Sequence, residues 1–283
     1  MTTYLTYKFY AAGFCTHLEC ITLRGSSWSP KTFPALCCLI KHPTQGYILY
    51  DTGYSDRFYQ ATKQWPFCLY RKITPVNLSP SEPLVEQLKN DGISPEDIRT
   101  IIISHFHADH IGGLRDFPRT KFICSQLAYD SVKGQKGMKA LRKGYLAPLL
   151  PDDFEQRTSF SESFNSLRPD VAYTPFQEAY DLFGDGQLLG VPLPGHAHGQ
   201  LGLIFGVRGE KPVFLVADSC WSSIAYKQNI LPSRLTALVH DNWQDYKKTL
   251  SKIHSLSQMN PMIRIVPSHC SDVALNLTEG GDV

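Results

Sequence analysis

The chain has 283 residues, of which 42% are hydrophobic and 19% charged, and its formal net charge is +2. This composition excludes a disordered or fibrous chain. The charged residues are interspersed, with no block of Lys or Arg, which argues against a dedicated nucleic-acid-binding protein. No apolar run approaches the roughly 18 residues of a membrane-spanning helix, and the first residues lack a signal-peptide pattern. We therefore expect one cytoplasmic domain over residues 1–283, with neither nucleic acid nor membrane as a partner.

Short apolar runs bounded by turn residues predict strands, and helical spacing with a capping residue or a Gly stop predicts helices. In the first half, the predicted elements are hairpin strands over 35–40 and 47–50, a helix over 82–91, a helix start at 94–97 and a buried strand over 100–103. In the second half, they are strands over 121–124, 188–191, 201–205, 213–216 and 262–266, an amphipathic helix over 242–257, and weak order from about residue 271. Periodicity alone thus predicts a mixed α/β fold in which helices cover sheets.

The strongest chemical signal directly follows the buried strand, where residues 105–110 read HFHADH. Strand alternation would place His105 and His107 on one side, where two nitrogens can converge on one metal ion. A bend at the following Gly-Gly pair can direct Asp109 and His110 to a second metal ion nearby. Mixed imidazole and carboxylate ligands suit zinc or iron better than calcium or magnesium. Isolated histidines are usually ordinary core or surface residues, whereas four ligands within six positions indicate a metal site.

This run resembles the HxHxDH signature of the metallo-β-lactamase superfamily. Further landmarks of that family follow in the expected order over about residues 30–270: Asp51-Thr52-Gly53, Pro194-Gly195-His196, Val216-Ala217-Asp218 and Val266-Pro267-Ser268-His269. The resemblance implies a four-layer αββα sandwich of two mixed sheets flanked by helices. It also places the site at one edge of the sandwich, between the sheets.

The same resemblance implies two divalent metal ions, expected to be zinc, with iron or manganese as alternatives. In that scheme, His105, His107 and His196 hold the first ion, Asp109, His110 and His269 hold the second, and Asp218 bridges both. Asp51 is implied to orient a ligand. The implied chemistry is attack by a metal-bridging hydroxide, with Asp109 transferring the proton.

Individual residues in and around the expected ligand set indicate which class of substrate the enzyme hydrolyses. Asp218 argues against a true β-lactamase, which usually lacks it, and the full ligand set is similar to that of N-acyl homoserine lactonases. Those enzymes commonly carry Tyr where this chain has Trp221, whose indole donates a hydrogen bond but cannot shuttle a proton. His198 and Trp221 are candidate substrate contacts, and an additional metal-ligand role is the alternative for His198.

The sequence therefore predicts a metal-dependent hydrolase of a small-molecule ester or lactone. Two alternatives stay open. One is a hydrolase of the phosphodiesterase or sulfatase type, and the other is a single-iron enzyme similar to persulfide dioxygenases. A homodimer is also left open.

Overall fold

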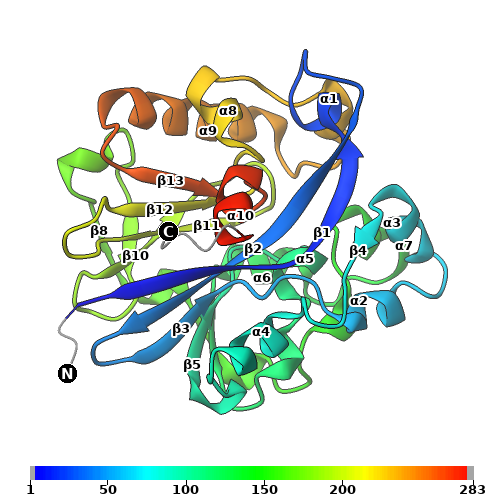
Figure 1. The fold of residues 1–283 in the computed structure, drawn as a ribbon, viewed down its shortest axis with the longest axis horizontal. Coiled ribbons are helices and arrows are strands. Elements are labelled where there is room, and N and C mark those ends of the chain that lie inside the picture. The colour runs from blue at the N-terminus through cyan, green and yellow to red at the C-terminus, as the bar shows by residue number, and fades with distance from the viewer. Residues whose placement is uncertain (1–3, 279–283) are drawn as a thin grey trace.

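The computed structural model describes residues 4–278, which fold into two facing β-sheets with helices on their outer sides (Figure 1). The seven-stranded sheet has the order β4-β1-β2-β3-β5-β6-β7, and the six-stranded sheet has the order β13-β12-β11-β10-β9-β8. The strands of the first sheet are β1 (Thr6–Leu18), β2 (Pro30–His42), β3 (Gly46–Tyr50), β4 (Val76–Asn77), β5 (Ile98–Ile102), β6 (Lys121–Cys124) and β7 (Thr158–Phe160). Those of the second are β8 (Asn165–Leu167), β9 (Ala179–Asp181), β10 (Leu188–Pro192), β11 (Leu201–Phe205), β12 (Val213–Ala217) and β13 (Arg264–Pro267).

Both sheets mix parallel and antiparallel pairs, as expected from the family resemblance. In the first sheet, β2 and β3 form an antiparallel hairpin, while β3, β5 and β6 run parallel. In the second, β11 pairs antiparallel with β12, and β12 pairs parallel with β13. The carboxyl ends of β5, β10, β12 and β13 lead into the loops that carry the predicted metal ligands, and β3 leads into Asp51.

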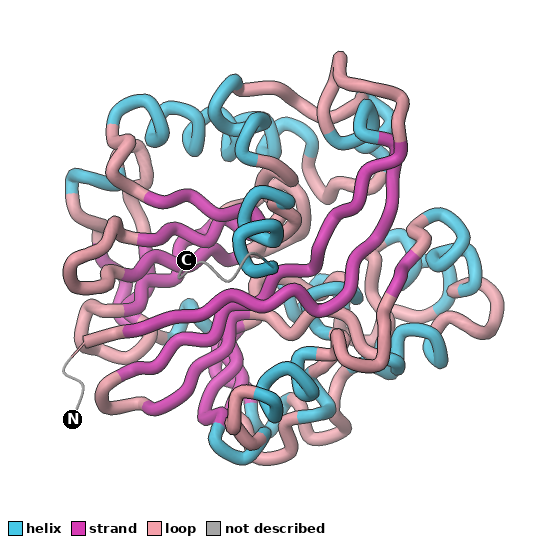
Figure 2. Tube along the Cα trace, viewed as in Figure 1, coloured by secondary structure: helices cyan, strands magenta, loops and turns pink. Residues whose placement is uncertain are grey.

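The helices are α1 (Glu19–Thr22), α2 (Asp56–Ala61), α3 (Cys68–Ile73), α4 (Leu84–Asn90), α5 (Ala108–Ile111), α6 (Gln126–Val132), α7 (Gly137–Arg142), α8 (Ser223–Gln228), α9 (Trp243–Met259) and α10 (Ser271–Thr278). Helices cover the outer faces of both sheets, whereas α10 packs Val273 into the core between the sheets. Helices α8 and α9 lie over the second sheet and α4 lies under the first, as Figure 2 also shows.

Successive side chains of the central strands pack alternately into two different cores, which explains the layered arrangement. On β5, Ile101 packs into the core beneath the helices of the first layer, whereas Ile102 packs into the core between the sheets. On β12, Leu215 faces the same inter-sheet core and Phe214 faces the core under α9. Successive side chains of a strand point to opposite faces, so a strand buried on both faces reads as a continuous apolar run. The four-layer αββα arrangement is confirmed.

Several elements differ from the sequence predictions. The 13-residue β1 was not predicted, because a β-bulge between Ala11 and Phe14 interrupts its alternation. The predicted helix start at Ser94 is a single 3-10 turn over Pro95–Asp97, since β5 begins directly after it. Helix α10 occupies the region expected to be weakly ordered, and residues 279–283 of that prediction lie outside the described residues.

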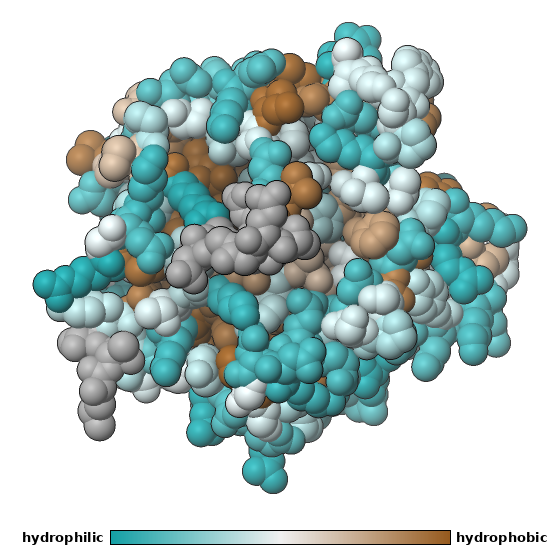
Figure 3. Space-filling view, viewed as in Figure 1, coloured by the Kyte–Doolittle hydropathy of each residue, from teal (hydrophilic) through white to brown (hydrophobic). Residues whose placement is uncertain are grey.

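The surface carries hydrophobic side chains only in separate patches among hydrophilic ones on the face shown in Figure 3. Within residues 4–278, no helix is both long enough and apolar enough to cross a bilayer.

Candidate metal centre

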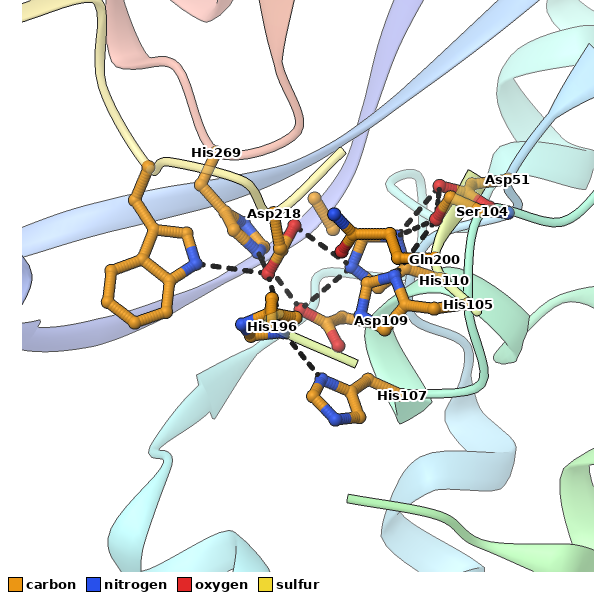
Figure 4. Close-up of polar contacts among 12 residues, drawn as sticks. Asp51, Ser104, His105, His107, Asp109, His110, His196, Gln200, Asp218 and His269 are labelled. Atoms are coloured by element: carbon orange, nitrogen blue, oxygen red, sulfur yellow. Dashed lines mark hydrogen bonds and ion pairs between the residues drawn. The ribbon is translucent and has the colours of Figure 1, made fainter. Parts of the chain in front are cut away.

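The seven residues predicted to bind metal come together at one edge of the sandwich, between the ends of the two sheets (Figure 4). The first sheet supplies the loop after β5 together with the short helix α5. The second sheet supplies the loops that follow β10, β12 and β13. The side chains divide into a three-histidine group (His105, His107 and His196) and a carboxylate group (Asp109, His110 and His269), with Asp218 beside both.

The three-histidine group offers converging nitrogen atoms. Its ligand atoms all lie within 4.8 Å of one another, and Nε2 of His196 is 3.0 Å from Nδ1 of His107. Nε2 of His105 is buried and has no hydrogen-bond partner among the described residues. Burial lowers the pKa of both His105 and His196 well below the usual value, so these rings stay neutral with free lone pairs. Buried nitrogens without partners are rare, and neutral imidazoles are the form that binds metal.

The carboxylate group lies around Asp218. Oδ1 of Asp218 is 3.4 Å from Nε2 of His110, while Oδ2 is 3.1 Å from Nε2 of His269 and 3.4 Å from Nε2 of His196. Asp218 thus lies between the two groups: Oδ1 faces His110, and Oδ2 faces both His269 and His196. Oδ2 of Asp109 lies 3.3 Å from Nε2 of His269 and completes the group.

The charges of this group show that it suits a cation. Burial alone would lower the pKa of His110, but the carboxylates of Asp51, Asp109 and Asp218 raise it to about 10. His269 behaves in the same way, because Asp218 and Asp109 outweigh its burial and raise its pKa. Burial would raise the pKa of Asp109, yet the neighbouring His110 and His269 lower it. Without a metal ion, protons on these imidazoles therefore offset the negative charge of the carboxylates. A divalent cation bound at the same place would offset that charge instead.

Backbone turns aim the ligands. Ala217, directly before Asp218, has φ of 47°, a conformation that side chains rarely adopt and that concentrates at functional sites. A Cβ on Gly112 would lie 2.5 Å from the carbonyl oxygen of Gly53, so only glycine permits this approach of the ligand loop to the Asp51–Gly53 turn. In that turn, the Thr52 backbone N–H donates to the His110 carbonyl oxygen at 2.8 Å. The expectation that strand alternation places His105 and His107 on one side was wrong. Strand β5 already ends at Ile102, so the loop after it brings these two histidines together.

Outer partners fix which ring nitrogen of each histidine faces the centre. Nδ1 of His110 is 2.7 Å from Oδ2 of Asp51, and the backbone N–H and hydroxyl of Ser104 donate to the same carboxylate at 2.8 and 2.7 Å. Nδ1 of His269 is 2.7 Å from the carbonyl oxygen of Pro34. In both histidines, the Nδ1–H donates outward, so Nε2 faces the cluster and could bind a metal ion that replaces its proton.

The three-histidine group has an outer partner that sequence reasoning missed. Nδ1 of His240 lies 3.2 Å from Nδ1 of His196, and its ring stacks on Tyr246 with centroids 4.1 Å apart. Burial lowers the pKa of His240 to about 4, so it faces His196 as a neutral ring. Because His240 stands alone in the sequence, it was interpreted as an ordinary histidine, and no local motif marks it.

The two candidate substrate contacts have partners within the protein. The Trp221 indole N–H donates to Oδ2 of Asp218 at 3.0 Å. His198 belongs to none of the metal-binding groups found among the described residues, and its Nδ1 lies 3.1 Å from Oδ2 of Asp241. The first contact indicates that Trp221 positions Asp218. His198 forms part of the wall of a cavity of about 380 Å³ that His107 and His196 also line.

Comparison with known proteins gives consistent results. A family model for the metallo-beta-lactamase superfamily matches residues 30–257. The N-acyl homoserine lactonase AiiB of Agrobacterium fabrum is 25% identical over 217 residues, which cover 76% of this chain and 72% of AiiB. The N-acyl homoserine lactonase AttM of Rhizobium radiobacter is 25% identical over 202 residues, which cover 70% of this chain and 68% of AttM.

Solved structures share the fold. An N-acyl homoserine lactone hydrolase with N-hexanoyl-L-homoserine bound at its catalytic metal center superposes with a TM-score of 0.70 at 18% identity, over 98% of this chain and 97% of that one. The dizinc quorum-quenching lactonase AidC superposes with a TM-score of 0.63 at 17% identity, over 94% and 87% of the two chains.

Proposed function

Because the chain belongs to the metallo-beta-lactamase superfamily and is a metal-dependent hydrolase, we propose that it opens lactone rings, with related carboxylic esters as its wider substrate class. The observation that carries this proposal is the position of Asp218, whose carboxylate lies within 3.4 Å of His110 and His269 of one ligand group and of His196 of the other. Such an arrangement suits a pair of cations and leaves positions open for water and substrate. The lactonase relatives support the choice of bond.

The proposed ligands follow the two groups. His105, His107 and His196 hold one ion, Asp109, His110 and His269 hold the other, and Asp218 contacts both. Zinc is the metal we propose, because nitrogen-rich sites with a few carboxylates suit it and because the structural relative AidC is a dizinc enzyme. When bound, a pair of divalent cations polarises the substrate carbonyl and lowers the pKa of a water molecule toward neutrality.

The protein's own side chains supply orientation and proton transfer. The Asp109 side chain is 11% exposed and is the most accessible carboxylate of the cluster, so it can reach a water molecule or a leaving group. We assign to it acceptance of the proton from the attacking water and its later return to the leaving alkoxide, which is general base and then general acid catalysis. Trp221 orients Asp218 through its indole N–H. Asp51 orients His110.

A location in the cytoplasm also belongs to this proposal. All eight cysteines are free thiols, which is typical of proteins in a reducing compartment.

The proposal is tested with purified, zinc-loaded protein. Lactone opening releases acid, so γ-butyrolactone and N-acyl homoserine lactones of several chain lengths should acidify a weakly buffered indicator solution. Elemental analysis should find two zinc ions per chain. Turnover of bis-p-nitrophenyl phosphate without turnover of any lactone or p-nitrophenyl ester would instead indicate a phosphodiesterase, and one iron per chain would indicate oxygen chemistry.

A further inference from the structure

The cavity beside the metal centre has the size of a small-molecule site. Its volume is about 380 Å³, and His107 and His196 form part of its wall. Ligand pockets commonly measure about 300–1,000 Å³. Phe106, Ala128 and Val132 contribute apolar surface. A substrate in this cavity therefore contacts two of the proposed metal ligands and an apolar wall.

Cationic side chains gather on one wall of this cavity. Lys139 and Arg142 from α7, and Lys143 directly after it, all line the cavity. Lys143 is neutralised by Asp241, whose Oδ1 lies 3.0 Å from its Nζ. Lys139 and Arg142 are exposed and have no acidic partner among residues 4–278. The only carboxylate in the lining is Asp241, so the cavity carries excess positive charge before any metal ion is counted.

The cationic segment is held against a metal ligand by Gly144. This residue has φ of 59°, and a Cβ on it would lie 2.5 Å from Cδ2 of His107. Its backbone therefore packs directly on the His107 ring. The neighbouring Ala140 and Tyr145 are buried, and the Tyr145 N–H donates to the Ala140 carbonyl oxygen at 3.0 Å. Lys139 and Arg142 thus extend from a segment that is fixed beside the metal centre.

A second cavity that adjoins the first carries the opposite charge. It measures about 300 Å³ and shares His198 and Asp241 with the first cavity, but none of the seven proposed metal ligands lines it. Its charged lining consists of Glu162, Asp241 and Asp245, with no Lys or Arg. Of these two adjoining cavities, only the one that opens onto His107 and His196 is lined by Lys and Arg. Arg57 and Arg115 line a separate cavity of about 530 Å³, but each of them forms an ion pair, with Asp116 and Asp152 respectively.

We propose that the substrate of this hydrolase carries an anionic oxygen group, a carboxylate or a phosphate, that Lys139 and Arg142 bind while the ester or lactone bond lies at the metal centre. This inference rests on the proposed function and adds a substrate class to it. A guanidinium group forms bidentate hydrogen bonds with carboxylate or phosphate, and a cationic cavity concentrates anions near its mouth. An uncharged N-acyl homoserine lactone would leave both cations without a partner.

Three lactones with the same ring test the inference: γ-butyrolactone, its 5-carboxylate, and its 5-hydroxymethyl phosphate ester. The wild-type, zinc-loaded protein should prefer an anionic lactone by about tenfold in kcat/KM, mainly through a lower KM, as expected for one or two charge-assisted hydrogen bonds. The double variant Lys139→Gln/Arg142→Gln should bring the ratio of anionic to neutral lactone close to one. The control Lys136→Gln, which removes an exposed cation of the same region outside the cavity, should keep the wild-type ratio.

The results separate this inference from the proposed function. Equal kcat/KM for the three lactones, or a ratio that the double variant does not change, overturns the inference while lactone hydrolysis stands. If none of the three is hydrolysed, the proposed function fails, and calorimetric titration with succinate and with inorganic phosphate decides the inference. Weaker binding of either anion to the double variant than to Lys136→Gln supports it and identifies the preferred group, whereas equal binding overturns it.

Discussion

The two ligand groups of the proposed metal centre are built differently. The three-histidine group contains only neutral rings, and its outer partner is another neutral ring, His240. The carboxylate group contains Asp109 and is supported from outside by the buried carboxylate of Asp51. An anionic outer partner raises the basicity of the histidine that it contacts. The carboxylate group should therefore hold its cation more tightly, and a chelator should remove the ion of the three-histidine group first.

The largest effect is expected where the two groups meet. The isosteric change Asp218→Asn removes the charge that both groups face while preserving the shape of the side chain. Loss of an outer partner alone typically costs about 10–100-fold in metal affinity or activity, so this change should lower kcat/KM by more than about 100-fold. Elemental analysis should find fewer than two metal ions per chain.

The surface variant Asp152→Asn is the matched control, because Asp152 is exposed, pairs with Arg115 and belongs to none of the ligand groups found among the described residues. It should retain full metal content and activity. Full activity in Asp218→Asn would remove the basis for treating the two groups as one centre.

The next largest effect tests the carboxylate group alone. Asp51→Asn keeps a residue that tolerates the φ of 60° at this position, but it replaces the carboxylate that accepts from Ser104 and His110. Metal affinity, measured by competition with a chromogenic chelator, should fall about 10–100-fold for one of the two ions. Equal weakening of both ions would contradict the asymmetry between the groups.

A smaller effect is expected from the outer partner of the three-histidine group. His240→Phe keeps a ring that can stack on Tyr246 but removes the nitrogen that faces His196. Because His240 is neutral, we expect metal affinity to fall about tenfold, the lower end of the roughly 10–100-fold range typical for loss of an outer partner. The visible spectrum of the cobalt-substituted protein should also change. The control Trp243→Phe alters the same stack without touching a ligand. If the two variants behave alike, His240 serves packing only.

The sequence allowed the centre to be predicted much better than its supports. Each proposed ligand follows a strand end or lies in a short motif, as in residues 105–110, so local patterns and the family resemblance were sufficient to predict that these side chains cluster. His240 lies 44 residues from His196, and only the packing of α9 brings its stacked ring to the ligand. The contact between Gly144 and His107 likewise depends on the path of the loop after α7. Long-range packing of this kind leaves no spacing signal in one sequence.

The smallest effect concerns Trp221, which contacts the oxygen of Asp218 that faces His196 and His269. Trp221→Phe removes the indole N–H but keeps an aromatic ring, so the carboxylate keeps its charge and loses one donor. A hydrogen bond to a charged group contributes about 1.5–3 kcal/mol when buried, and the partial exposure of Trp221 places the loss at the low end, about tenfold or less in kcat. Metal content should stay at two ions per chain, because no proposed ligand is removed. A fall in kcat without a fall in metal content would show that orientation of Asp218 acts on the reaction itself, whereas loss of one ion would show that the indole supports one of the two groups.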